Sequence, residues 1–368
     1  MLYIKNEINK FNLKRKNTMY ETIYIEKNKS NRFGVYFYED ATQWNVFKDI
    51  YGMNDQKLAV ICSECIKNDA WKAFADSFEN EDVLRLSEKN ADSINDFIVK
   101  KSVEDYTFVI LSDISVMKAL YDNITSDVSK GSFVCVPMTP EALFQDISIR
   151  PLIDDNGETI RKEWYPKAVY VDVSVLSKAS PLEFRNAIAS AFKLAISHKA
   201  SMFEWMISNM YELTDCEEEA ICELLERGFN VMKERIEKDT AKERAVSSYG
   251  KDFYDLMKKA DSELSFADCM SLALVCQTYL SWKKDLISME EYYEIRDMFV
   301  FFGLSITETF ATADELTDIL MNSDADIMKR ENCVYIRKLG KTVVDASPSK
   351  ELIKEALEQI YFNEEAID

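Results

Sequence analysis

The sequence predicts an N-terminal α/β domain with a mostly parallel sheet, followed by an all-α domain. Two observations lead to this prediction. Short β-rich runs alternate with helical stretches through the first half of the 368 residues, which is typical of a doubly wound sheet. From residue 181 onward the periodicity is helical to the end, with one interruption. We expect a basic tail over 1–18, an α/β domain over 19–175 and a helical domain over 176–368.

The strands of the first domain are recognised by their short apolar runs, and helical candidates lie between them at 69–79 and 90–101. A loop is expected over 154–166, before the last strand. The predicted strands cover residues 20–25, 33–38, 57–62, 82–86, 106–111, 132–136 and 168–173.

The second domain begins at a clear helix start. Ser180 is a cap, Pro181 stands in the first turn and Glu183 completes a capping box. A second capping box runs from Thr312 to Glu315. A small hairpin is expected across Leu339 and Gly340. The predicted helices cover residues 181–198, 201–212, 216–238, 243–260, 264–284, 289–302, 313–321 and 348–361.

Composition narrows the classes of function. The chain carries 45 Lys+Arg against 65 Asp+Glu, and a net charge of −20 argues against a nucleic-acid binder. No apolar run approaches the ~20 residues of a membrane span, and residues 1–18 lack the apolar core of a signal peptide. We therefore expect a cytoplasmic protein without a membrane partner.

Eight cysteines without a regular framework favour reduced thiols, and a redox dithiol at Cys62 and Cys65 is a weak alternative. The single histidine, His198, excludes a site that needs two imidazoles from one chain.

Two helical faces carry polar side chains of interest. On the predicted helix 243–260, Arg244, Ser248, Lys251 and Asp255 are spaced four, three and four and share one side. On helix 181–198, Lys193 shares a polar strip with two serines. A solvated surface explains both faces, and a binding cleft between the domains is the alternative.

Several segments resemble the dehydroquinate synthase family of sugar-phosphate cyclases in their order and spacing. The resemblance implies a Rossmann-like N-terminal domain and a helical metal- and substrate-binding domain, with an interdomain cleft as the site. The segments are 136–139 (VPMT), 165–172 (YPKAVYVD), 181–184 (PLEF), 187–193 (AIASAFK) and 249–253 (YGKDF).

The family binds NAD on a glycine-rich turn and a divalent metal, usually zinc, in its helical domain. It oxidises, dephosphorylates, reduces and closes a heptulose phosphate. Where the family has consecutive glycines, this chain reads SDISV over 112–116, and Asp113 would repel a pyrophosphate. NAD is therefore a possible cofactor whose motif is lost.

The resemblance places the family's metal ligands at residues that do not suit zinc. The glutamate position falls at Ser190, the two histidine positions fall at Lys251 and Ser265, and a further histidine falls at Asp255. Hydroxyls and an ammonium are not zinc ligands, so we expect no zinc here.

Other positions keep a charge suited to an anion. Lys193 and Arg244 match cationic residues of the family's substrate pocket. Lys251 would bring an ammonium near the lost metal, with Asp255 one turn on as its partner. We assign Lys193, Arg244, Lys251 and Asp255 to catalysis, and Asp146, Lys193, Arg244 and Ser248 to substrate binding.

Two functions follow from these positions. In the first, the protein binds a phosphorylated or carboxylated small molecule and carries out altered, zinc-independent cyclase or lyase chemistry. In the second, it is an inactive pseudoenzyme that binds a ligand or pairs with an active homologue. A homodimer or a heteromer with a homologue is the expected assembly, since dimers are usual in the family.

Overall fold

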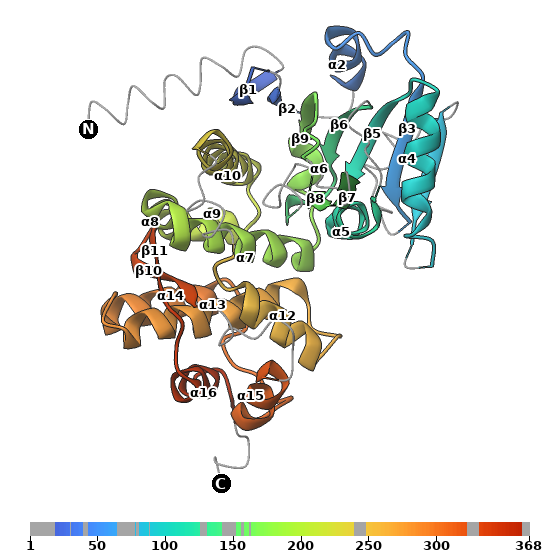
Figure 1. The fold of residues 1–368 in the computed structure, drawn as a ribbon. Coiled ribbons are helices and arrows are strands. Elements are labelled where there is room, and N and C mark those ends of the chain that lie inside the picture. The colour runs from blue at the N-terminus through green and yellow to red at the C-terminus, as the bar shows by residue number, and fades with distance from the viewer. Residues whose placement is uncertain are drawn as a thin grey trace, which may run out of the picture. The chain divides into compact units, whose positions relative to one another are not determined.

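The chain forms two compact units in a computed structural model (Figure 1). The first unit comprises Met1–Ala179 and Ile221–Glu237, and the second comprises Ser180–Ala220 and Lys238–Asp368. The domain boundary at 175/176 stays a prediction. The structure describes residues 19–29, 31–39, 43–64, 78, 81–87, 89–125, 131–141, 152–155, 158–161, 163–238, 248–321 and 331–362.

The first unit is built on a seven-stranded sheet with the order β1-β2-β9-β6-β5-β3-β4. Only β1 runs antiparallel to its neighbour, and the other pairs are parallel. The predicted mostly parallel sheet is therefore confirmed, with strand ends displaced by a few residues. The strands are β1 (Met19–Asn28), β2 (Asn31–Tyr38), β3 (Leu58–Ser63), β4 (Asp82–Leu86), β5 (Thr107–Ser112), β6 (Ser132–Pro137) and β9 (Ala168–Asp172).

The central strands are mostly apolar and are buried along their whole length. Every residue of β3, β5 and β9 is buried, as expected for interior strands of a parallel sheet. Within this unit, α5 packs against β3 and β5, while α4 packs against β4. The helices are α2 (Trp44–Ile50), α4 (Ser93–Val103), α5 (Ile114–Asn123), α6 (Val173–Leu176) and nearly all of α10 (Glu218–Lys238).

The helix α10 joins the first unit although it follows the start of the second in sequence. The ring of Phe229 lies edge-on to that of Phe37 on β2, with centroids 5.8 Å apart. At the end of α10, Oε1 of Glu237 accepts a hydrogen bond of 3.2 Å from the backbone N–H of Glu26 on β1. These contacts attach α10 to the antiparallel edge of the sheet.

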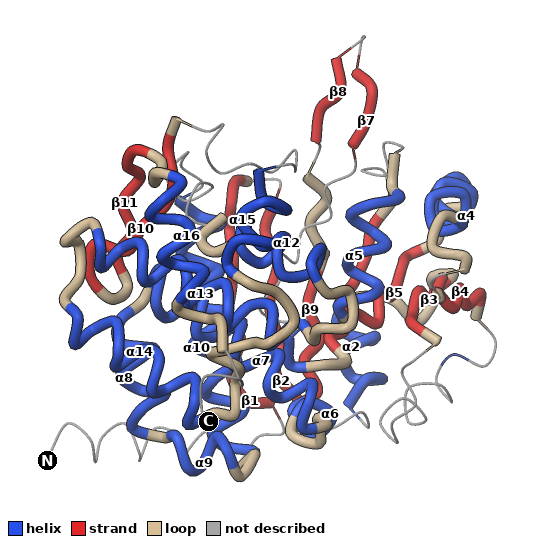
Figure 2. Tube along the Cα trace, turned by 90° about the horizontal axis from the view of Figure 1, so that it is seen from below, coloured by secondary structure: helices blue, strands red, loops and turns tan. Residues whose placement is uncertain are grey.

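The second unit is largely helical and centres on α13 (Phe266–Lys283). This helix is apolar nearly all round, and almost every residue from Ala267 to Ser281 is buried, because α7, α12, α14, α16 and β10 all pack against it (Figure 2). The other elements are α7 (Pro181–His198), α8 (Ala200–Ser208), α9 (Met210–Thr214), α12 (Lys251–Ala260), α14 (Met289–Phe301), α15 (Ala313–Met321), α16 (Lys350–Glu358), β10 (Asn332–Lys338) and β11 (Lys341–Ala346).

The local signals predicted for this unit are confirmed. Ser180 and Glu183 form both hydrogen bonds of a capping box. Thr312 and Glu315 do the same, with Glu315 N donating to Thr312 Oγ1 over 3.3 Å and Thr312 N donating to Glu315 Oε2 over 2.8 Å. The strands β10 and β11 pair antiparallel across Gly340.

Three sequence predictions differ from the structure or fall outside it. The predicted loop 154–166 contains part of a hairpin, formed by β7 (Leu152–Asp155) and β8 (Glu158–Arg161). Of the predicted helix 243–260, residues 251–260 form α12 after a turn at 248–250 in which Gly250 is left-handed (φ 76°), and residues 243–247 lie outside the described residues. The predicted helix 69–79 lies outside the described residues, except for Phe78. In the part of the chain that the structure describes, no helix is long and apolar enough to cross a bilayer.

Candidate ligand-binding site

The first group of candidate residues lies on α7. Its capping box fixes where the helix begins, and the polar strip follows from helical spacing. Ser190 is buried and Lys193 is half-buried. The carbonyl oxygen of Lys193 accepts a hydrogen bond of 2.5 Å from Ser197 Oγ, which also lies 2.6 Å from Nδ1 of His198. The helix thus holds Lys193 on a polar strip of an otherwise apolar element.

The second group lies at the start of α12. The ammonium of Lys251 forms an ion pair with the carboxylate of Asp255, one turn further along the helix. The predicted partnership of these two residues is present. Both side chains reach solvent, with exposed fractions of 58% and 37%. Because α7 and α12 both pack on α13, the same central helix positions Lys193 and Lys251.

The predicted single stripe of four polar residues is wrong in one respect. Ser248 lies in the turn that precedes α12, where its carbonyl oxygen accepts a hydrogen bond of 2.9 Å from the N–H of Lys251. A turn does not continue the helical spacing, so Ser248 is not on the helical face of Lys251 and Asp255. Arg244 and Asp146 lie outside the described residues.

The third candidate, Ser265, begins α13 as its cap. Its hydroxyl accepts a hydrogen bond of 3.1 Å from the N–H of Asp268 and donates one of 2.5 Å to Oδ2 of the same residue. The other carboxylate oxygen, Oδ1, accepts a hydrogen bond of 2.6 Å from Ser305 Oγ. Ser271 Oγ in turn donates to the carbonyl of Ser305 over 2.7 Å. Ser265 is therefore part of a hydrogen-bonded network that joins α13 to the segment after α14.

Sequence reasoning missed this network. The spacing of Ser265 and Asp268 matches a helix-capping pattern, which is a signal that the sequence contains. Ser305, however, lies 37 residues further along the chain, and nothing in the local pattern connects it to Asp268.

These residues do not fit a zinc ion. Ser190, Lys251 and Ser265 offer two hydroxyls and an ammonium, whereas zinc binds thiolate, imidazole and carboxylate ligands. The Lys251 ammonium and the Ser265 hydroxyl are in addition occupied by Asp255 and Asp268. Among the described side chains, no group of three or more His, Cys, Asp and Glu is arranged to hold a metal. We therefore derive no step that passes through a metal.

Cys62 and Cys269 are poor nucleophiles. Burial is the main cause that raises the pKa of Cys62 and Cys269 to about 11 each. A thiol with such a pKa is protonated at neutral pH, and only the thiolate attacks a disulfide. Cys269 and Cys276 are fully buried, as the apolar helix predicts. Cys65 lies outside the described residues.

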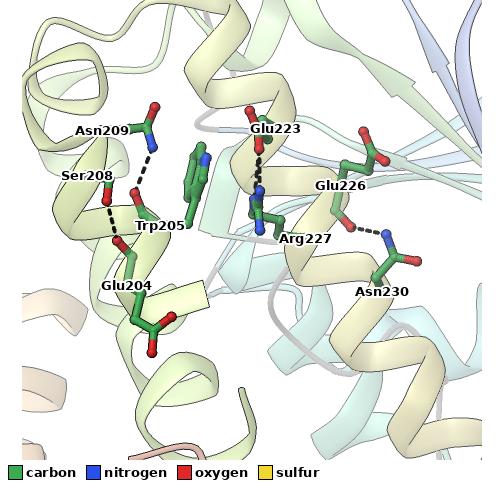
Figure 3. Close-up of polar contacts among 8 residues, drawn as sticks. All are labelled: Glu204, Trp205, Ser208, Asn209, Glu223, Glu226, Arg227 and Asn230. Atoms are coloured by element: carbon green, nitrogen blue, oxygen red, sulfur yellow. Dashed lines mark hydrogen bonds and ion pairs between the residues drawn. The ribbon is translucent and has the colours of Figure 1, made fainter. Parts of the chain in front are cut away.

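Polar side chains on α8 and α10 hydrogen-bond within their own helices (Figure 3). On α8, Ser208 Oγ and Asn209 Nδ2 donate to the carbonyls of Glu204 and Trp205 over 2.9 and 2.8 Å. On α10, Arg227 pairs with the carboxylate of Glu223, with Nε 3.0 Å from Oε1. This ion pair neutralises the guanidinium of Arg227.

Comparison with known proteins relates the chain to one group of enzymes. No protein-family model matches it. The curated 3-dehydroquinate synthase of Campylobacter concisus (strain 13826) is 23% identical over 208 residues, which are 55% of this chain and 59% of that enzyme. The chain thus matches somewhat over half of the length of this relative.

Solved structures resemble the chain over nearly its whole length. A 2-deoxy-scyllo-inosose synthase complexed with carbaglucose-6-phosphate, NAD+ and Co2+ has a TM-score of 0.72 at 12% identity, covering 92% of this chain and 99% of that one. A 2-epi-5-epi-valiolone synthase from Streptomyces hygroscopicus subsp. jinggangensis 5008, with NAD+ and Zn2+ bound, has a TM-score of 0.71 at 13% identity, covering 91% and 98%. The fold is dehydroquinate-synthase-like, and in sequence the chain is a distant homologue of 3-dehydroquinate synthases.

Proposed function

We propose that this protein binds a phosphorylated or carboxylated small molecule and converts it by zinc-independent cyclase or lyase chemistry. The observation that carries the proposal is which side chains occupy the positions that the resemblance implies for the family's metal and substrate sites. Ser190, Lys251 and Ser265 stand where the family binds its metal, while Lys193 and Arg244 keep their positive charge. The homology supports a small-molecule substrate, and the charges support an anionic one.

The roles of the individual residues follow from their chemistry. Lys193, half-buried on α7, would lose little solvation on binding a phosphate or carboxylate and would form charge-assisted hydrogen bonds with it. Lys251 adds a second ammonium, and Asp255 holds it in place through their ion pair and would act as a general base toward a substrate hydroxyl. An ammonium attracts an anion but does not polarise a hydroxyl as a Lewis acid does. The chemistry would therefore differ from that of the metal-containing enzymes. Asp146, Arg244 and Ser248 complete the proposed substrate-binding set.

The proposal is tested by calorimetric titration with carbaglucose-6-phosphate, the ligand of one structural relative. We expect measurable binding to the unaltered chain. Lys193→Gln and Arg244→Gln should each weaken it about tenfold or more, since a hydrogen bond to a charged group contributes ~1.5–3 kcal/mol. The triple variant with Lys251→Gln should abolish binding.

Lys259→Gln is the matched control, because Lys259 is an exposed lysine on the same helix α12 as Lys251. It removes the same charge and should leave binding unchanged. A failure of the unaltered chain to bind this sugar phosphate and a panel of carboxylated sugars would contradict the proposal.

The second candidate function is that of an inactive subunit which binds a ligand or pairs with an active homologue. The observation that favours it is the engagement of Ser265 and Lys251 in hydrogen bonds and an ion pair of the protein itself. An assay for the release of phosphate from sugar phosphates distinguishes the two functions. Binding of a sugar phosphate without its conversion supports the inactive subunit. Native mass spectrometry of the purified protein measures whether the assembly is a homodimer or a heteromer.

A further inference from the structure

The junction between β5 and α5 is the part of the first unit where a dinucleotide would be expected. β5 lies inside the sheet, between β3 and β6, and ends at Ser112. In open parallel sheets, ligands bind at the carboxyl ends of the strands, and their phosphates lie on the free N–H groups of the helix that follows. Two structural relatives hold NAD+, so this junction is where the residues must be compared with the cofactor.

Asp113 occupies the junction and caps α5. Its backbone is extended (φ −128°, ψ −178°), and its side-chain Oδ1 accepts a hydrogen bond of 2.7 Å from the N–H of Val116. Its carbonyl oxygen accepts a further hydrogen bond of 3.0 Å from the N–H of Met117. One of the N–H groups that a helix start offers to a phosphate is therefore already used by this chain's own carboxylate.

The Asp113 carboxylate is buried and surrounded by donors. Its residue is only 8% exposed. Besides the N–H of Val116, the hydroxyls of Ser63 and Ser115 hydrogen-bond to it. Burial raises the pKa of Asp113, and these hydrogen bonds oppose the rise. A helix N–H together with serine hydroxyls is the set of donors that usually surrounds a bound phosphate.

A pyrophosphate does not fit beside this carboxylate. Two anions at one helix start repel each other, and the repulsion is strong where burial lowers the effective dielectric. The glycines of a dinucleotide-binding turn also allow close approach of the backbone, whereas Asp113 and Ser115 place side chains there. Ser63 belongs to β3, so donors of two neighbouring strand ends, at β3 and β5, converge on Asp113 rather than on an open space.

We infer that Asp113 acts as a built-in anion at the start of α5, and that the first unit consequently does not bind NAD+ at this junction. The carboxylate stabilises the helix start that a cofactor phosphate stabilises in a dinucleotide-binding fold. Asp113 belongs to the first unit, so the result of its test does not depend on whether a ligand binds at Lys193 and Lys251 in the second unit.

Thermal unfolding of the full-length chain tests the inference with NAD+ and inorganic phosphate as probes. The unaltered chain should show no rise in melting temperature with NAD+, because a ligand of the folded state would raise it. Inorganic phosphate should raise the melting temperature of Asp113→Ser more than that of the unaltered chain, because the substitution removes the anion that repels phosphate. The phosphate would then occupy the helix start that the carboxylate has left.

Asp92→Ser is the matched control for charge. Asp92 also precedes a helix, α4, but is exposed and its side chain makes no capping hydrogen bond. Its response to phosphate should equal that of the unaltered chain at matched ionic strength. If Asp113→Ser does not fold, Asp113→Asn, which also removes the negative charge, replaces it. The inference is overturned if NAD+ raises the melting temperature of the unaltered chain, or if the Asp113 variant responds to phosphate no more than Asp92→Ser.

Discussion

At the scale of single residues, Glu308 is a buried carboxyl group that sequence reasoning did not find. It lies between α14 and α15, where no periodic pattern reports which side chains are buried. Its Oε2 accepts hydrogen bonds of 2.6 and 3.2 Å from the N–H groups of Phe310 and Ala311, while its buried Oε1 has no hydrogen-bond partner in the structure. Burial raises the pKa of Glu308 above its ordinary value. The same limit applies to predicting the candidate site. Helical spacing identifies Lys193 and Lys251 in the sequence, whereas the hydrogen bond between Asp268 and Ser305 depends on a tertiary contact that no local pattern reports.

We predict that Glu308 makes the folding stability fall as the pH rises. A raised pKa in the folded state means that its stabilising effect is complete below the ordinary pKa and is lost as the carboxyl ionises. As the pH rises from about 4 to about 7, the free energy of unfolding of the unaltered chain should therefore fall relative to that of Glu308→Gln. Urea unfolding at several pH values measures this shift.

Glu315→Gln is the control with the opposite sign. The N–H and hydroxyl of Thr312 lower the pKa of Glu315, so its stabilising effect is present at neutral pH and is lost on acidification. As the pH rises, the free energy of unfolding of the unaltered chain should therefore increase relative to that of Glu315→Gln. Parallel pH profiles for Glu308→Gln and the unaltered chain would contradict the assignment.

At the scale of elements, the sequence predicted the strands and most helices because each obeys a simple period. Capping boxes marked the starts of α7 and α15, and Gly340 marked the turn between β10 and β11. The errors arose where a backbone feature interrupts the period. Gly250 adopts a positive φ just before α12, so no single helix runs through it, although the apolar spacing continues. The β7–β8 hairpin escaped prediction because its strands are only four residues each.

Gly340 also anchors the β10–β11 hairpin to the last turn of α7, next to the start of α8. Its φ is 72°, its N–H donates to the carbonyl of Ile196 over 2.8 Å, and an added Cβ would lie 2.2 Å from the backbone nitrogen of Ala200. Backbone atoms cannot move aside as a flexible side chain would. We predict that Gly340→Ala lowers the free energy of unfolding by about 2–4 kcal/mol, through strain at positive φ together with this clash.

Gly303→Ala separates the two causes. Gly303 has a similar φ of 66°, but an added Cβ meets no atom within 4 Å. The strain alone should cost about 1 kcal/mol. Urea unfolding of both variants measures the difference, and equal losses would show that the contact with Ala200 is unimportant.

At the scale of the whole molecule, the order of strands and helices made the fold predictable, since collinear segments resemble one family. The net charge of −20 argues against nucleic acid as a partner but could not indicate a local site. The three residues that the resemblance implies for the metal positions are more informative than the total charge.

We predict that zinc neither binds tightly to the folded chain nor stabilises it. Ser190, Lys251 and Ser265 supply no zinc donor set, so there is no binding free energy to add to folding. Adding zinc, or removing metals with EDTA, should leave the melting temperature unchanged. One zinc ion per chain retained after dialysis against EDTA would contradict the prediction.

The attachment of α10 to the first unit has a consequence for synthesis of the protein. The last strand of the seven-stranded sheet ends at Asp172, but the unit is complete only when α10, up to Glu237, is present. At roughly 5–20 residues per second, a ribosome needs several more seconds to deliver that helix. During this interval Phe37 on β2 lacks its neighbour Phe229, while α7 and α8 of the other unit have already been made. Part of the antiparallel edge of the nascent sheet therefore stays uncovered until α10 is translated, which happens after synthesis of the second unit has begun.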